Sequence, residues 1–314
     1  MLRTIPTGLL LLLAAVPRAI PQPGDARQTI QAVKAEEQAA GIKPSGNFAR
    51  ADPAVTAYYR CYYTGKLELP QSYDQLKLKD GTNEGCPLDE DKYDVFFYPI
   101  EAVSTGHVPV TQALAAASVE RLATVVPHED FHLQVRDLPD RVAEAATTLV
   151  GFLAGAAAAE TLGNTRLRDE AEIFLRKAVM LNRYFERLSA LYKSAHAGAI
   201  SKAGALDQKG QIMTALLGEC RSLQPEPRSF NRCAPVANNA GIAFDYTYTR
   251  DYPAVYRVYR ACRRDLRCMV AAMERAPRNR PEAEVLRYLE AFARNAVTAD
   301  VPPALPKDRI ESRP

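Results

Sequence analysis

The residues His-Glu-Asp-Phe-His at positions 128–132 constrain this chain more than any other feature. On an α-helix, residues i and i+4 lie about 40° apart and one turn along the axis, so His128 and His132 direct two imidazoles toward one point. This is the spacing with which one helix supplies two ligands to a tetrahedral zinc ion. Glu129 lies on the neighbouring flank, where it reaches a water on the metal rather than the metal. The chain has only four histidines, which argues against a chance motif.

A catalytic zinc ion takes three protein ligands and leaves the fourth position to water, so one ligand must come from elsewhere. Glu144 is the favoured candidate, because a turn at residues 136–140 folds the next helix back along the first and brings Glu144 beside the histidines. Glu160 is its rival, but it lies about 160° around the same helix, so the two cannot both face one ion. Two aspartates are weaker candidates, one pointing away from the histidine face and one in the turn: Asp130 and Asp137.

Small residues follow Glu144 along one face of its helix. Thr148, Gly151 and Gly155 are four, seven and eleven positions further on, which places all three near the face of Glu144. Such a stripe allows the metal-binding helix to approach closely, and the Thr148 hydroxyl is placed to orient a ligand. Alternatively, the glycines serve tight helix packing alone. The alternative for the whole motif is a charged helix start with incidental histidines.

The first residues have the features of a targeting segment. Arg3 precedes an apolar run at residues 9–16, and Ala19 is a plausible cleavage position, so residues 1–19 are predicted to be a signal peptide. The apolar run is too short to span a bilayer as a mature helix, although an uncleaved anchor is the alternative. No other segment indicates a membrane span. We therefore expect an exported protein, periplasmic or secreted.

All six cysteines follow this segment, which in an exported chain indicates disulfides. Six thiols allow 15 connectivities. Neighbour pairing is favoured because each bond would close a local segment: Cys61–Cys86, Cys220–Cys233 and Cys262–Cys268. Buried free thiols are the alternative, and zinc binding by these cysteines is disfavoured because no Cys-x-x-Cys pair occurs.

The pattern along the chain predicts a mainly helical α+β protein. Residues 25–110 form a small N-terminal α+β part with a helix at 25–42 and a strand at 93–99. Residues 111–300 are helical, and residues 301–314 form a charged, proline-rich, disordered tail. The expected helices are 111–126, 141–163, 166–197, 205–222, 251–275 and 281–297. Pro127 either begins the helix of the histidines or kinks a longer one.

The charges of the chain are mixed, and the formal net charge is only +3. Nothing in this balance indicates a nucleic-acid surface. The oligomeric state cannot be derived from the sequence.

Four stretches, in this order, resemble a bacterial family of predicted aminopeptidases, exported metallopeptidases of the gluzincin type. They are YDVFFYPIEAVSTG (93–106), VVPHEDFH (125–132), EAATTLVGF (144–152) and NNAGIAFDYTYTRDYPAVYRVY (238–259), and the likeness covers about half the chain. The resemblance implies a zincin-like core in which His128 and His132 bind the metal and Glu144 is the third ligand. Glu129 is then the general base.

A polar cluster near the C-terminus also matches the family: Asn238, Asn239 and Tyr248. Tyr248 is a candidate donor to the oxyanion, although tyrosines in such a stretch also serve packing. His107 and His196 are looser candidates for the same role. The chain departs from the family pattern at Pro127, Leu133 and Ala143, and it lacks the cysteine for lipid attachment.

The function expected from the sequence is zinc-dependent hydrolysis of peptide bonds in peptide or protein substrates outside the cytoplasm. Zinc would activate a water, and Glu129 would take its proton and pass it to the leaving amine. The alternatives are a catalytically inactive binding module with the same fold and a metal-dependent hydrolase of a non-peptide amide.

Overall fold

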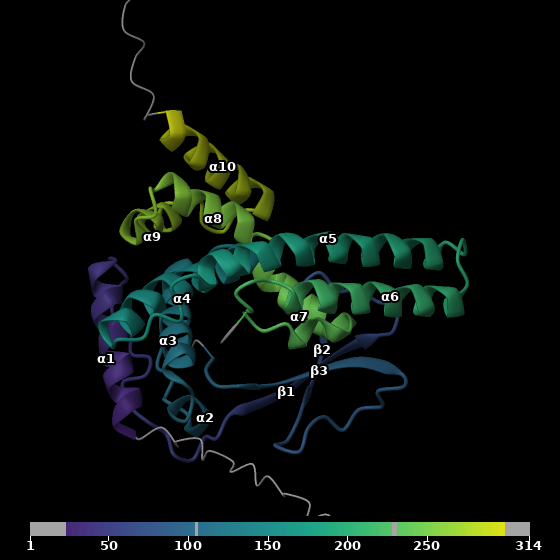
Figure 1. The fold of residues 1–314 in the computed structure, drawn as a ribbon, viewed down its shortest axis with the longest axis horizontal. Coiled ribbons are helices and arrows are strands. Elements are labelled where there is room, and N and C mark those ends of the chain that lie inside the picture. Colours follow the sequence, from purple (N-terminus) through teal and green to yellow (C-terminus); the bar gives the residue numbers. More distant parts are fainter. Residues whose placement is uncertain (1–22, 104–105, 228–230, 299–314) are drawn as a thin grey trace, which may run out of the picture.

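A computed structural model describes residues 23–103, 106–227 and 231–298 (Figure 1). The predicted signal peptide and the predicted C-terminal tail lie outside these residues. Over the described part the protein is a mainly helical α+β structure with one small sheet, as the sequence predicts. In chain order the elements are α1 (Pro23–Ala39), β1 (Tyr58–Gly65), η1 (Tyr73–Gln75), β2 (Lys77–Asp80), β3 (Tyr93–Ile100), α2 (Gln112–Ala115), α3 (Val119–Val135), α4 (Asp140–Thr161), α5 (Glu170–His196), α6 (Lys202–Arg221), η3 (Ala234–Ala237), α7 (Asn239–Thr249), α8 (Tyr252–Ala261), α9 (Leu266–Glu274) and α10 (Glu282–Thr298).

The sheet is antiparallel with strand order β2-β1-β3, and it lies below the long helices in Figure 1. Aromatic and β-branched residues dominate β1 and β3, the composition that suits a pleated, half-buried surface. Tyr62 pairs with Phe96 across the two strands. Phe244 of α7 packs on both, with ring centroids 5.1 Å from Tyr62 and 4.8 Å from Phe96. The sheet is thereby fixed to α7.

Helix α3 runs unbroken through Pro127, so the helix of the histidines does not begin at the proline. The predicted helix at 111–126 is wrong in its bounds, because a short α2 ends at Ala115 and α3 starts after Ser118. The Ser118 hydroxyl caps α3 by accepting the Arg121 N–H at 3.2 Å. Pro127 has no N–H, so the Ala123 carbonyl lacks its usual donor one turn later.

Helix α4 packs tightly along α3 at the predicted stripe of small residues. A Cβ atom added at Gly155 would overlap the Ala123 carbonyl and lie 2.8 Å from its carbon. One added at Gly151 would lie 2.8 Å from the Thr124 carbonyl oxygen. Both obstacles are backbone atoms, which cannot rotate away. The two glycines therefore set the distance between the helices.

Helix α4 is also the one described helix that is long and apolar enough to cross a membrane by length and composition. Of its most apolar 18-residue window, 83% is buried inside the protein. Apolar partners on α3, α5 and α8, among them Phe131, Phe174 and Tyr252, surround it in the largest core cluster. The composition of α4 is accounted for by this central position in the fold.

The C-terminal helices depart from the prediction in two places. The helix expected at 251–275 is divided into α8 and α9, because Arg263 and Arg264 have positive φ values of 55° and 64°. The Cys262–Cys268 disulfide spans the break. Helix α7 was not expected, and its start is capped by the Asn238 side chain, which accepts the Gly241 N–H at 3.0 Å.

The six cysteines form three disulfides with the expected neighbour pairing: Cys61–Cys86, Cys220–Cys233 and Cys262–Cys268. The first ties the central strand to the loop before β3, and the second joins α6 to the segment before α7. Three disulfides in one chain are typical of proteins that fold in an oxidising environment.

Replacing Gly155 with alanine tests the helix contact. We expect Gly155→Ala to lower the free energy of unfolding by about 1–3 kcal/mol, because the new methyl group meets backbone that cannot yield. The matched control is Gly210→Ala in α6, where nothing lies within 4 Å of an added Cβ atom. That exposed helical site should gain about 0.5–1 kcal/mol from the loss of glycine flexibility. Urea unfolding of both variants measures the difference, and equal midpoints would contradict the packing argument.

Candidate metal centre

Three side chains from α3 and α4 converge on one point. The Nε2 atoms of His128 and His132 lie 3.2 Å apart. The Glu144 Oε2 atom lies 3.4 Å from the first and 3.3 Å from the second. Ligands about 2.1 Å from a tetrahedral ion lie about 3.4 Å from each other, so the three atoms already have the separation of a ligand set. The group could hold a metal ion in this arrangement.

The short turn between α3 and α4 positions this group. His128 and His132 are one turn apart on α3, and Glu144 lies in the second turn of α4. A Cβ atom at Gly151, two turns beyond Glu144, would lie only 3.2 Å from the Cβ of His128. The stripe on α4 therefore lies against the histidine face of α3, as its spacing suggested.

Tyr73 binds the carboxylate oxygen of Glu144 that faces away from the two imidazoles. Its hydroxyl donates a hydrogen bond to Glu144 Oε1 at 3.0 Å, which leaves Oε2 facing the two imidazoles. The Tyr73 backbone N–H donates to Thr247 Oγ1 at 2.8 Å, so α7 fixes the position of η1. Sequence reasoning missed Tyr73, because it lies in a turn-rich segment 71 residues before Glu144 and no local pattern distinguishes it from its neighbours.

The buried charges of the group balance one another. Burial alone would raise the pKa of Glu144, but the adjacent His132 and His128 hold it well below its usual value. Burial alone would lower the pKa of His132, but the Glu144 carboxylate, whose Oε2 lies 3.3 Å from His132 Nε2, raises it to about 9. His132 therefore carries a proton at neutral pH, and the group is an ion pair when no cation is bound.

Glu129 and Tyr248 lie at the same site. The Tyr248 ring centroid is 6.2 Å from that of His128 and 6.3 Å from that of Tyr73. Burial, followed by the charges of Glu144 and Glu129, raises the pKa of Tyr248 well above its usual value, so the phenol keeps its proton. Glu129 directly follows His128 on α3 and is half-buried, and its negative charge also contributes to raising the pKa of His132.

The rival acidic residues face elsewhere. Glu160 is exposed at the far end of α4 and pairs with Arg168 at 2.6 Å. Asp130 is buried on the other side of α3, where it pairs with Lys34 of α1 and accepts a hydrogen bond from Ser45 Oγ at 2.6 Å. Asp137 lies in the turn, half exposed, with its carboxylate 4.0 Å from Arg136. None of the three belongs to the group of converging ligand atoms.

The remaining candidates have structural contacts. Asn238 donates to the Val95 carbonyl of β3 at 2.8 Å. Asn239 donates to the carbonyls of Lys66 and Glu68 at 3.0 and 2.9 Å, so both asparagines join α7 to the sheet. The two histidines outside the motif lie apart from the ligand group, in the loop packed against Gly46 and at the exposed end of α5: His107 and His196.

A buried arginine lies beside Glu129 and was not singled out by the sequence. The Arg121 Nε donates to Glu101 Oε2 at 2.9 Å, and its guanidinium also contacts the Tyr98 hydroxyl. Burial and then the like charge of Arg232 lower the pKa of Arg121 to about 10, whereas the negative charge of Glu129 opposes this shift. The positive charge of Arg121 is therefore neutralised mainly by Glu101, with a further contribution from the charge of Glu129.

Comparison with known proteins identifies a family for this chain. Residues 77–286, about two-thirds of the chain, match the sequence model of a family described as "Putative aminopeptidase". The matched region contains the three converging residues, Glu129 and Tyr248, whereas Tyr73 precedes it. No curated protein and no solved structure gives a significant match. The chain belongs to the putative aminopeptidase family.

Proposed function

We propose that this protein is a zinc-dependent peptidase. The observation that supports the proposal best is the separation of 3.2–3.4 Å between the three ligand atoms of His128, His132 and Glu144. Two imidazoles and one carboxylate are the ligand set of catalytic zinc sites that keep a position for water. The family relationship indicates a peptidase, and the three disulfides favour a periplasmic or secreted location.

Zinc in this site would supply a Lewis acid that polarises the substrate carbonyl and lowers the pKa of water. Glu129 then takes the proton of the attacking water and delivers it to the nitrogen of the leaving amine. Tyr248 keeps its phenolic proton and donates a hydrogen bond to the carbonyl oxygen as that oxygen becomes negatively charged. Tyr73 holds Glu144 so that one carboxylate oxygen faces the ion.

Substitution of the two glutamates separates metal binding from catalysis. We expect Glu144→Ala to lose zinc and Glu129→Gln to keep it while hydrolysis falls about 10²–10⁴-fold, because only the proton transfer is removed. Elemental analysis of the purified chains and a peptide-hydrolysis assay measure the two effects. Glu160→Gln is the matched control and should keep both. Full zinc in Glu144→Ala together with loss in Glu160→Gln would show that the third ligand is assigned wrongly.

Removal of the Tyr73 hydroxyl tests the support of Glu144. We expect Tyr73→Phe to weaken zinc affinity about 10- to 100-fold, because the carboxylate loses the hydrogen bond that orients it. Competition with a chromogenic chelator measures the affinity directly. Tyr63→Phe serves as the control, since this tyrosine packs on Tyr93 at 5.2 Å rather than on the ligand group. Equal affinities for all three chains would contradict the positioning role.

The raised pKa of His132 predicts a proton released on metal binding. At pH 7.5 the apo protein holds a proton on His132, because its pKa is about 9, and a cation must displace it. We expect close to one proton from this group at pH 7.5 and progressively less as the pH rises through 9. Calorimetric titration with zinc in buffers of different ionisation enthalpy counts the protons. A release that does not change between pH 7 and 10 would contradict this assignment.

A further inference from the structure

Four aromatic rings lie together on the face of the sheet against which α7 packs. They come from β1, β3 and α7 and are here called the aromatic cluster: Tyr62, Phe96, Tyr98 and Phe244. Phe244 is the central ring, with its centroid 5.1 Å from that of Tyr62, 4.8 Å from Phe96 and 6.3 Å from Tyr98. Rings of the helical core such as Phe152 are completely buried, whereas all four rings of the cluster are only half-buried. Each ring of the aromatic cluster therefore keeps accessible surface.

The aromatic cluster adjoins the candidate metal centre at two points. The Tyr248 ring centroid lies 5.5 Å from that of Phe244 and 6.2 Å from that of His128. The Arg121 guanidinium lies 5.8 Å from the Tyr98 ring centroid and also contacts the Tyr98 hydroxyl. Arg121 and His128 are seven residues apart on α3, so they share one face of that helix. The aromatic cluster therefore lies alongside the face of α3 that carries the metal ligands.

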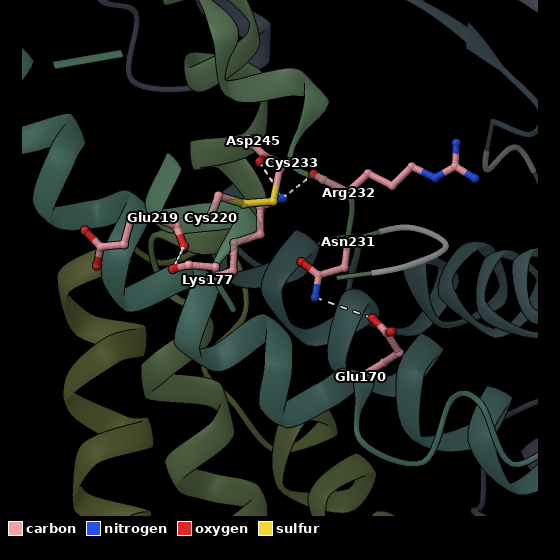
Figure 2. Close-up of a disulfide and its surroundings, with 9 residues drawn as sticks. Glu170, Lys177, Glu219, Cys220, Asn231, Arg232, Cys233 and Asp245 are labelled. Carbon is pink, nitrogen blue, oxygen red and sulfur yellow. Dashed lines mark hydrogen bonds and ion pairs between the residues drawn. A yellow bond between two sulfur atoms is a disulfide. The ribbon is translucent and has the colours of Figure 1, made fainter. Parts of the chain in front are cut away.

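Helix α7, which carries Phe244, is anchored to α5 and α6 (Figure 2). Its next residue, Asp245, pairs at 2.7 Å with Lys177 of α5, a fully buried lysine. The segment that leads into α7 is bonded to α6 through the Cys220–Cys233 disulfide. A ring on a helix fixed in this way loses little further freedom when a ligand packs on it.

The chemistry of the aromatic cluster suits an apolar occupant. Ring faces offer a large apolar contact area, and an aromatic ligand gains additional offset or edge contacts with them. The polar groups at the Tyr98 end are paired with one another, because Arg121 Nε donates to Glu101 Oε2 at 2.9 Å and the guanidinium also contacts the Tyr98 hydroxyl. A polar side chain would have to displace these contacts, whereas an apolar one would not.

We propose that the aromatic cluster binds an aromatic or large aliphatic side chain of the substrate, on a residue adjacent to the bond that is hydrolysed. The proposal rests on the proposed peptidase function. Only the Tyr248 ring separates Phe244 from His128. Consecutive residues of an extended peptide advance about 3.3–3.6 Å, so a long side chain beside a bond held at the metal reaches the cluster. The preferred substrates are then peptides with phenylalanine, tyrosine or leucine at this position.

A positional series of peptides tests this proposal. The probes are pentaalanine and the peptides in which phenylalanine replaces each alanine in turn, with the zinc-loaded unmodified chain as the enzyme. We expect kcat/KM for at least one phenylalanine peptide to exceed that for pentaalanine about 10- to 100-fold. Mass spectrometry should find the cleaved bond beside the phenylalanine. Glutamine at the same position should give no such gain, and equal rates for all the peptides would overturn the inference.

Neighbouring residues of β3 provide matched variants, because Phe96 and Phe97 face opposite sides of the sheet. Phe97 is also half-buried, but it stacks on Tyr59 with ring centroids 6.2 Å apart. We expect Phe96→Leu and Phe244→Leu each to lower the preference for the phenylalanine peptide about 10-fold, and Phe97→Leu to keep it. Leucine keeps these positions apolar, and thermal unfolding checks that all three variants are folded. A preference that survives in both cluster variants, or is lost equally in Phe97→Leu, would overturn the inference.

Binding without turnover separates failure of this proposal from failure of the proposed function. The zinc-loaded Glu129→Gln chain should bind the preferred phenylalanine peptide about 10- to 100-fold more tightly than pentaalanine. If this difference depends on Phe96 and Phe244 but the unmodified chain hydrolyses no peptide, the peptidase function is wrong and the apolar site remains. If the unmodified chain hydrolyses pentaalanine as fast as every phenylalanine peptide, the apolar site alone is wrong. Absence of both binding and hydrolysis for every peptide would overturn both.

Discussion

The close approach of α3 and α4 is the constraint on which the rest of the structure depends. Gly151 and Gly155 bring the backbone of α4 against that of α3, and the short turn between the helices fixes their axial register. With the helices at this distance, a carboxylate in the second turn of α4 meets two imidazoles one turn apart on α3. An extra methyl group at the contact would displace the Glu144 oxygen relative to the two imidazoles. The relative positions of three ligand atoms must be correct to within a few tenths of an ångström for them to bind one ion.

The sequence was sufficient to predict those features that depend on helical geometry or on short separations. The converging residues follow from a spacing of four on one helix and from a turn too short to allow any other packing. Neighbouring cysteines paired as expected because each bond closes a local loop. The strand at 93–99 follows from its run of aromatic and β-branched residues, and the α+β class follows from the helical pattern that begins near residue 110.

Features that depend on long-range contacts could not be predicted in the same way. Tyr73 reaches Glu144 only because α7 holds η1 through Thr247. The residues around Tyr73 in the sequence give no indication of that contact. The break between α8 and α9 falls at two arginines with positive φ, a conformation that sequence patterns assign to glycine or asparagine. The Ala123 carbonyl, which Pro127 leaves without its helical donor, is the one that lies against Gly155 of α4, and this contact could not be predicted from the local sequence.

The electrostatics of the site are those of a buried carboxylate compensated by a neighbouring positive charge. Glu144 is almost completely buried, and its carboxylate stays ionised there only because a proton on His132 compensates its charge. A divalent cation held by the three ligand atoms would take the place of that proton. Glu129 and Arg121 are not part of this ion pair, and their opposite charges interact with each other.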